Sequence, residues 1–316
     1  MAIIAEDARF GKFGQVFAPL RAARKGSIMR NTGTMVRKRG ESMEGAAGLT
    51  YARYEAGHWQ RVDGAVIEEG FVTISVNGQE LVTVMCTPHD QDRLALGFLR
   101  AEGLIAGLDD VRLLRVTHGG CLVDVWLRRD EGRRPKRRIL TSGCGGGVTF
   151  GIDGTTESLP PPRLESSLHI APARVCEMMS RLLAAARLYA EVRGVHTSAL
   201  SDGQTLLAVA EDVGRHNTLD KLWGDCMLRG IETRDRILLA TGRISSEMIH
   251  KAARMGTPIV ASRTSPTSLS VRLAREWGLT LVGYVRPNRF RVYAGAERLD
   301  APKDLVEAML MAGETA

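Results

Sequence analysis

Strand-like and helix-like runs alternate along the C-terminal half of the chain, and this alternation limits the possible folds more than any other feature. Strands are predicted at residues 206–210, 236–240, 258–261 and 279–284, with a last short strand near 291–293. Helices are predicted to begin between them, near Thr218, Ser246 and Thr267. Strands separated by helical crossovers usually pair in parallel. The sequence therefore predicts a larger, layered α/β domain.

The residues before this domain predict a smaller domain of the α+β class. Strand-like runs lie at residues 71–76, 80–86, 111–117 and 121–127. Asn77 and Gly78 join the first two runs and supply the two left-handed residues of a type I′ hairpin turn. Thr87 is expected to be the N-cap, and Pro88 a first-turn residue, of a helix that ends near Gly103.

These patterns divide the chain into five segments. They are a weakly ordered basic extension (1–50), the small α+β domain (51–140), a glycine-rich cysteine loop and linker (141–165), the α/β domain (166–300) and a C-terminal tail (301–316). Residues 1–48 carry nine Lys or Arg against four Asp or Glu. Three prolines at 160–162 exclude a helix there, whereas an amphipathic helix is predicted from about 172 to 193.

Charge and cysteine usage narrow the class of protein. The 316 residues carry a net charge of +7, which favours an anionic partner such as a nucleotide, a polynucleotide or an acidic protein. Five widely spaced cysteines, an odd number, argue against a disulfide framework and for a reduced, cytoplasmic protein. No pair has zinc-ligand spacing, so no metal ligands are predicted. No apolar run reaches the roughly 20 residues of a membrane helix.

One cysteine stands apart from the others. Cys144 lies in Thr-Ser-Gly-Cys-Gly-Gly-Gly at 141–147, where glycines allow close approach of a ligand or backbone. Seven basic residues between 128 and 138 precede it, and a positive field favours the reactive thiolate. The residues alone leave open whether Cys144 is reactive or incidental to a glycine-rich turn. The other cysteines are predicted to pack in strands or helices: Cys86, Cys121, Cys176 and Cys226.

Polar turns follow the strands of the predicted α/β domain. They lie at residues 211–217, 241–246, 262–267 and 285–289. They contain five arginines: Arg215, Arg243, Arg263, Arg286 and Arg289. If the strands are parallel neighbours, these turns meet at one sheet edge and would suit a ligand with several phosphates. The alternative is that Ser and Thr only cap helices and the arginines are solvated. No turn matches a P-loop or a well-placed Gly-x-Gly-x-x-Gly.

Three more side chains of this domain are candidates for the site. His216 is interpreted as a general base, a ligand contact or a histidine satisfied within its turn. Asp212 would either fix Arg215 or bind the edge of a base. His196 precedes small residues and is expected to face the site.

Several of these motifs resemble those of one family. Residues 211–217 with Asp220 and Lys221, residues 242–245 with Glu247, and residues 279–284 are similar to motifs of the formate dehydrogenase accessory sulfurtransferase family (FdhD). So are Asn77-Gly78, Thr87-Pro88, residues 97–99 with Glu102-Gly103, and Gly143-Cys144-Gly145. The resemblance extends over residues 68–293, with the motifs in order, and leaves residues 1–50 outside it.

The resemblance implies a function and a fold. Members receive sulfur as a cysteine persulfide from a cysteine desulfurase. They pass it to a molybdenum or tungsten cofactor with two guanine dinucleotide arms, which is then inserted into formate dehydrogenase. The larger domain would have a cytidine deaminase-like fold, and the protein would be a homodimer. Deaminase chemistry is not implied, because Thr197 and Ser198 follow His196 and no Pro-Cys-x-x-Cys occurs.

The resemblance also implies site residues. The persulfide position falls on Cys144, and the cofactor-contact stretch falls on Tyr284, Val285, Arg286, Pro287, Asn288 and Arg289. The polar turns add six residues to the predicted cofactor-binding set: Asp212, Gly214, Arg215, His216, Arg243 and Ser245.

One position departs from the family pattern. Many members have a second cysteine three residues after the first, where this chain has Gly147. A two-cysteine relay in this loop is therefore excluded, whereas a persulfide on Cys144 alone is chemically sufficient. Gly147 motivates an alternative function, a cofactor-binding chaperone without sulfur transfer. Nucleic-acid binding is disfavoured, because aromatic residues make up only 5% and do not interleave with the basic runs.

Overall fold

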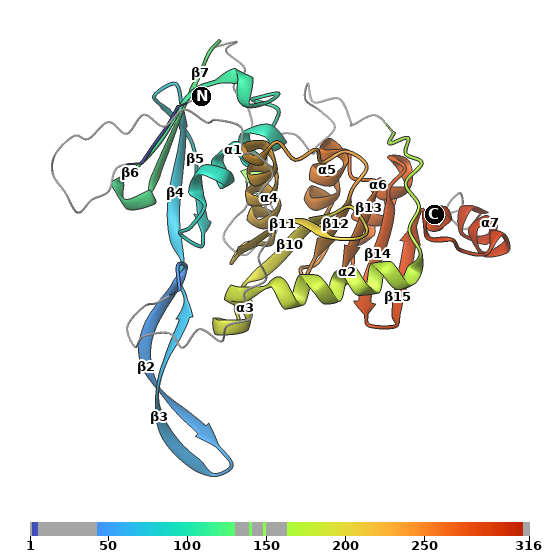
Figure 1. The fold of residues 1–316 in the computed structure, drawn as a ribbon, viewed down its shortest axis with the longest axis horizontal. Helices are drawn as coiled ribbons and strands as arrows, with labels where there is room; N and C mark the ends of the chain where they lie inside the picture. The colour runs from blue at the N-terminus through green and yellow to red at the C-terminus, as the bar shows by residue number, and fades with distance from the viewer. Residues whose placement is uncertain (1, 6–42, 130–138, 141–147, 150–162, 312–316) are drawn as a thin grey trace, which may run out of the picture.

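The computed structural model describes residues 2–5, 43–129, 139–140, 148–149 and 163–311 (Figure 1). The fold is a mixed α/β architecture with two lobes. A five-stranded sheet with one helix forms the N-terminal lobe, and a six-stranded sheet between helices forms the larger lobe. A long β-hairpin projects from the junction of the two lobes (Figure 1).

The N-terminal lobe has the strand order β1-β6-β7-β4-β5. Its strands are β1 (Ala2–Ala5), β4 (Gly70–Val76), β5 (Gln79–Cys86), β6 (Val111–Thr117) and β7 (Leu122–Leu127). Asn77 and Gly78 have φ of 51° and 76°, which confirms the predicted left-handed hairpin turn. Helix α1 (Gln91–Ala101) packs on the sheet through an apolar face that includes Leu94 and Leu99.

Two expectations for the N-terminal half are corrected. Helix α1 begins at Gln91 after Asp90, not after Thr87, because Asp90 takes the left-handed conformation at φ 54° and starts the helix there. Part of the predicted extension is also ordered, because β1 pairs in parallel with β6 and residues 46–50 belong to strand β2. These short segments carry no periodic apolar pattern, so they gain order by adding to a sheet or hairpin.

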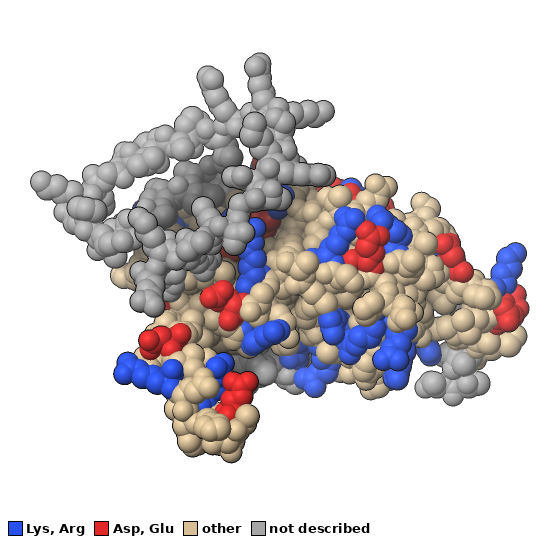
Figure 2. Space-filling model, turned by 60° about the horizontal axis from the view of Figure 1, so that its bottom comes forward, with Lys and Arg blue, Asp and Glu red and all other residues tan. Residues whose placement is uncertain are grey.

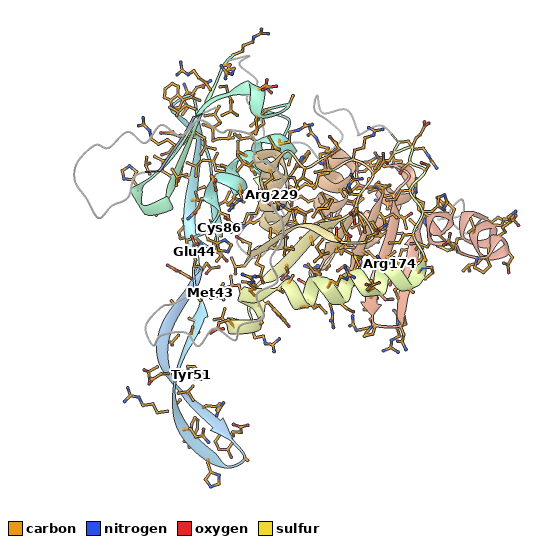
Figure 3. All side chains as sticks on the ribbon, in the orientation of Figure 1. Met43, Glu44, Tyr51, Cys86, Arg174 and Arg229 are labelled. Atoms are coloured by element: carbon orange, nitrogen blue, oxygen red, sulfur yellow. The ribbon has the colours of Figure 1, made fainter. Side chains whose placement is uncertain are left out.

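The projecting hairpin is formed by β2 (Ala46–Glu55) and β3 (His58–Ile67). Most of its side chains are exposed, and Tyr51 stands well away from the body (Figure 3). A second, very short ladder pairs β8 (Ile139–Leu140) with β9 (Val148–Thr149). Residues 141–147, which include Cys144, lie between these strands and outside the described residues.

The larger lobe has the strand order β11-β10-β12-β13-β14-β15. Its strands are β10 (His196–Ser201), β11 (Leu206–Asp212), β12 (Ile237–Ala240), β13 (Ile259–Ser262), β14 (Thr280–Arg286) and β15 (Arg289–Ala294). The predicted parallel pairing is confirmed for β12, β13 and β14, whereas β10, β11 and β15 pair antiparallel to their neighbours. Strand β10 was not predicted, because its sequence has no run of large apolar residues.

Helices cover both faces of this sheet (Figure 1). One face packs against α2 (Pro172–Ala185), and the other packs against α4 (Arg215–Arg229), α5 (Ser246–Met255) and α6 (Ser268–Glu276). The predicted long helix ends at Ala185, because Ala186 has ψ of 81°, and a short helix, α3 (Arg187–Val192), follows. The predicted tail contains α7 (Lys303–Met311).

Helices α1 and α4 join the two lobes at an unusually close crossing. A Cβ on Gly97 of α1 would lie 1.8 Å from the carbonyl oxygen of Asp220, and a Cβ on Gly224 of α4 would lie 2.0 Å from that of Arg93. Each helix therefore presents a glycine to the backbone of the other. Any side chain at either position would force the helices apart, so these glycines set the distance between the lobes.

Candidate functional site

The turns that follow β12, β13 and β14 lie side by side at one edge of the larger sheet. Arg263 N–H donates to Ala240 O at 3.1 Å, and Tyr284 N–H donates to Thr264 O at 3.1 Å. The Ser262 hydroxyl donates to Gly242 O at 2.6 Å. Because β10 runs antiparallel to β12, His196 at its start lies at the same edge. The structure thus brings three of the four predicted turns and His196 together.

Arginines line this edge. The Arg286 guanidinium is half-buried, and its Nη1 donates to Arg263 O at 2.8 Å and to Val285 O at 2.9 Å. These bonds hold the cation in the turn, while Arg243 and Arg289 are exposed on either side. Figure 2 shows Lys and Arg side chains gathered on this lower face of the larger lobe. The arrangement is a positively charged rim suited to a multiply charged anion.

The backbone at Tyr284 is irregular in a way that shapes the rim. Tyr284 has φ of 55°, and the register between β14 and β15 shifts between Gly283 and Arg286. Left-handed φ is uncommon for a residue with a bulky side chain, and such outliers and bulges occur often at functional sites. The Tyr284 ring lies 4.5 Å beneath the Arg291 guanidinium. Pro287 and Asn288 form the exposed turn.

The start of α4 reaches the same edge. Its N-cap is Gly214, which has no side chain to cap the helix, so the positive end of the helix dipole lies at this edge. Gly214 is needed because a Cβ there would lie 2.7 Å from Asn217 Nδ2. The next residue, Arg215, packs against Gly242 together with His196. Burial, followed by the nearby Arg215, lowers the pKa of His196, which is therefore neutral at physiological pH.

Asp212 is placed differently from the expectation that it contacts a ligand. It is fully buried, and its oxygens accept from Gly214 N–H at 2.7 Å, from the Asn217 amide at 2.8 Å, from Thr87 N–H at 3.1 Å and from Lys221 Nζ at 2.7 Å. Lys221 Nζ also donates to Thr87 O at 2.9 Å. The carboxylate therefore binds the N-terminal lobe to α4 and has no face open to a ligand.

Beside the Asp212 carboxylate, the His216 ring links a serine on one side to a glutamate on the other. His216 Nε2 lies 2.8 Å from Ser245 Oγ, and His216 Nδ1 lies 3.3 Å from Glu247 Oε2. Burial lowers the pKa of His216 to about 4, although Glu247 opposes the shift, so the ring is neutral at pH 7. With its proton on Nδ1, facing Glu247, the ring accepts from the Ser245 hydroxyl. Ser245 also caps α5 by accepting from Met248 N–H at 3.4 Å.

A second buried ion pair lies behind these residues. Lys251 Nζ is 2.7 Å from both oxygens of Asp220 and 3.4 Å from Glu247 Oε1. Burial alone would lower the pKa of Lys251, but the two carboxylates outweigh it and raise the pKa. Lys251 thus remains charged and links Glu247 to the α1–α4 crossing at Asp220. This pair fixes the orientation of Glu247 and, through it, of His216.

The described cysteines separate into two classes. Cys86, Cys176 and Cys226 are buried, as expected of packing residues, and burial raises the pKa of Cys86 and of Cys226 to about 12. Cys121 was predicted to pack but is exposed, because it precedes β7 at the sheet surface. The predicted persulfide position, Cys144, lies outside the described residues.

Comparison with known proteins identifies the family. The FdhD/NarQ family matches residues 67–300. The chain belongs to the FdhD/NarQ family. Sulfur carrier protein FdhD of Staphylococcus aureus, strain MRSA252, is 36% identical over 255 residues, which are 80% of this chain and 96% of the relative. The same protein of strain Newman matches with the same identity and coverage.

A solved structure supports the same relationship at the level of the fold. The crystal structure of a putative formate dehydrogenase accessory protein from Desulfotalea psychrophila matches with a TM-score of 0.64 and 28% identity. The match covers 80% of this chain and 99% of that one. No helix in the described ranges is long and apolar enough to cross a membrane. Among the residues that the structure places, no three His, Cys, Asp or Glu side chains are arranged to hold a metal ion.

Two residues near the candidate site of this FdhD/NarQ family member have roles that the sequence did not indicate. Lys251 was not singled out, because a lysine in an amphipathic helix is usually solvated and its buried partner, Asp220, lies 31 residues away. Thr87 was assigned to a helix cap, whereas its hydroxyl accepts from Val213 N–H at 3.0 Å across the lobes. No local sequence signal indicates such long-range pairs.

Proposed function

We propose that this chain is a sulfur carrier that loads a molybdenum or tungsten cofactor for formate dehydrogenase. Cys144 accepts sulfur from a cysteine desulfurase, and the arginine rim of the larger lobe holds the cofactor, a substrate with two guanine dinucleotide arms. Two relatives named as sulfur carrier proteins and membership of the FdhD/NarQ family support the sulfur chemistry. The observation that carries the proposal is the convergence of Arg243, Arg263 and Arg286 at one sheet edge.

The loading step is a thiol exchange. The Cys144 thiolate attacks the outer sulfur of a persulfide on the desulfurase. One S–S bond forms on Cys144, the S–S bond of the donor breaks, and the donor cysteine leaves as a thiolate. No oxidant is consumed. Since Gly147 replaces a second loop cysteine, the persulfide stays on Cys144 until an acceptor takes the outer sulfur.

The sheet edge supplies binding rather than covalent chemistry. Arg286 and Arg289 would contact phosphates through guanidinium donors, and the start of α4 adds the positive end of its helix dipole. His196 and the Ser245 hydroxyl offer neutral polar groups beside them. The predicted homodimer and the desulfurase contact are part of the same proposal.

The persulfide is tested by intact-mass measurement after incubation with a cysteine desulfurase and cysteine. We expect the added mass of one sulfur atom on the wild type and on Cys121→Ala, whose thiol is the exposed one among the described cysteines. We expect no addition on Cys144→Ala. Sulfur that persists on Cys144→Ala would refute the proposed carrier residue.

The alternative function is a cofactor-binding chaperone without sulfur transfer, and Gly147 is the feature that favours it. Formate dehydrogenase is produced together with the wild type or with Cys144→Ala, and its activity is measured. Sulfur transfer predicts an inactive formate dehydrogenase with Cys144→Ala. Full activity with that variant would establish the chaperone.

The rim is tested with GDP as a fragment of the cofactor. At 100 times its Kd, GDP should raise the free energy of unfolding by about 2.7 kcal/mol. Arg286→Ala with Arg289→Ala should weaken binding about tenfold or more, because two charge-assisted hydrogen-bond donors are lost. Arg229→Ala is the control, since Arg229 lies at the far end of α4 (Figure 3). Equal GDP affinity in the double variant would remove both arginines from the site.

A further inference from the structure

A cavity of about 520 Å³ lies where the two lobes meet. Its walls come from the β4–β5 hairpin, the end of α1 and the turn after it, the end of β7, and α5. Arg254 of α5 lines it near the C-terminal end of that helix, whereas Ser245 precedes the first turn. The cavity is therefore separated from the sheet edge by the length of α5, roughly 14 Å at the rise of an α-helix.

The lining combines apolar side chains with four arginines: Arg100, Arg128, Arg129 and Arg254. Leu81, Leu104 and Ile105 supply much of the apolar wall. A cavity of a few hundred Å³ with an apolar lining and a few convergent charged groups is typical of a site for a small organic ligand.

Two of these arginines, Arg100 and Arg254, line the cavity and form no ion pair with another described residue. The Arg100 guanidinium stacks 5.1 Å over the Trp223 ring. Arg254 passes over Gly103, where a Cβ would lie only 2.5 Å from Nη2. Gly103 also has φ of 75°, a conformation that favours glycine, and the absence of a side chain there leaves room for the Arg254 guanidinium. Among the described residues, neither guanidinium has a carboxylate oxygen within 4.0 Å.

Burial disfavours the charged forms of both arginines, and nearby carboxylates oppose this effect. Burial lowers the pKa of Arg100, and Asp110 opposes that shift. Burial also lowers the pKa of Arg254; Glu102 opposes this, and the nearby Arg100 adds to it. Arg100 thus opposes the positive charge of Arg254, although less than Glu102 favours it, and burial of both cations remains a cost that a bound anion would reduce.

The groups around the cavity compensate only part of the positive charge of its arginines. The carbonyl end of α1 favours one cation near Arg100. The acidic lining residues are Glu80, Asp109 and Asp110, so the four arginines leave an excess of one positive charge. Asp110 is also engaged, since its Oδ2 accepts from Ala106 N–H at 2.5 Å.

We propose that this cavity binds a small organic phosphate. Arg100 and Arg254 contact the phosphate in the interior, Arg128 and Arg129 add charge at the mouth, and the apolar wall contacts the organic part of the ligand. The bound anion offsets the repulsion between guanidiniums that come from different lobes, so it also stabilises the lobe junction. This inference is independent of sulfur transfer and of the cofactor site.

Titration calorimetry with AMP on the full chain tests the site. We expect saturable binding that weakens about tenfold or more in Arg254→Gln. Arg128→Gln with Arg129→Gln should weaken it too, and both positions are exposed, so this variant tests the site even if Arg254→Gln fails to fold. Arg229→Gln on the surface of α4 should bind AMP as the wild type does.

Three results would contradict the proposal. An AMP titration that releases or absorbs no more heat than a KCl titration at equal ionic strength would overturn it, and so would citrate that binds as tightly as AMP. A loss of AMP binding in Arg286→Gln, with normal binding in Arg254→Gln, would place the phosphate on the sheet edge and not in this cavity.

Discussion

The α1–α4 crossing makes a strong prediction about Gly97. In Gly97→Ala the new Cβ would lie 1.8 Å from the carbonyl oxygen of Asp220 and 2.5 Å from its carbonyl carbon, both of which are backbone atoms that cannot rotate away. The helices must therefore separate by about 1 Å, because heavy atoms cannot approach closer than about 3 Å. Overpacking of this kind usually costs about 1–3 kcal/mol.

The displacement also strains two buried ion pairs. Asp220 and Lys221 are consecutive on α4, and each makes a 2.7 Å contact, with Lys251 and Asp212 respectively. Breaking a buried pair costs about 3–5 kcal/mol, so partial loss adds to the steric cost. We expect Gly97→Ala to lower the free energy of unfolding by at least about 3 kcal/mol, which is a large part of the usual 5–15 kcal/mol.

The assay is urea unfolding followed by circular dichroism, with melting temperature as a second measure. The expected loss corresponds to a Tm lower by about 10 °C for a protein of this size class. Gly107→Ala is the matched control, because no atom lies within 4 Å of its Cβ position and it should change stability by less than about 0.5 kcal/mol. A loss below about 1 kcal/mol in Gly97→Ala would refute the close crossing.

Three further variants test the polar core of the larger lobe. Lys221→Met should lower stability by about 3–5 kcal/mol in urea unfolding because it strands the Asp212 carboxylate, whereas exposed Lys303→Met should change little; similar losses would contradict the buried pair. Burial lowers the pKa of His216 to about 4, so its contribution to stability is complete above pH 6.5 and declines toward pH 4. When the pH falls from 7 to 4.5, the free energy of unfolding of His216→Asn should therefore decrease by about 2 kcal/mol less than that of the wild type. Equal decreases in the two proteins would exclude this role of His216. Ser245→Ala removes the α5 cap and should lower the free energy of unfolding by about 1 kcal/mol, which is measured as a lower Tm. An unchanged Tm would show that the cap is weak.

The larger sheet could be predicted because its strands and crossovers carry local signals. Apolar runs mark β12 and β13, and Ser245 and Thr267 cap α5 and α6 close to where the helices were expected to begin. Strand β10 lacks such a run, since small residues suffice where helices pack on both faces. The break at Ala186 was also hidden, because the apolar periodicity continues through it.

The sequence predicted which residue types lie at the candidate site better than it predicted which residues contact one another there. The arginines and small polar residues of the turns identified the sheet edge, because the carboxyl ends of parallel strands meet there. The use of Asp212 was not foreseeable: its partners Thr87 and Lys221 are separated by more than a hundred residues, and only the folded lobes bring them together. Local sequence cannot distinguish such a buried carboxylate from one that faces a ligand.

The glycine pair at the lobe junction has a consequence for how the protein is made. Gly97 and Gly224 are separated by about 130 residues, so the partner of α1 leaves the ribosome roughly 6–25 s after α1 itself at ordinary rates of synthesis. During that interval the N-terminal sheet can form, but the face of α1 that meets α4 remains uncovered. Met227 of α4 packs against the apolar cores of both lobes, so completion of either core requires the other. Folding of the first lobe is therefore completed only after the nascent chain has passed α4.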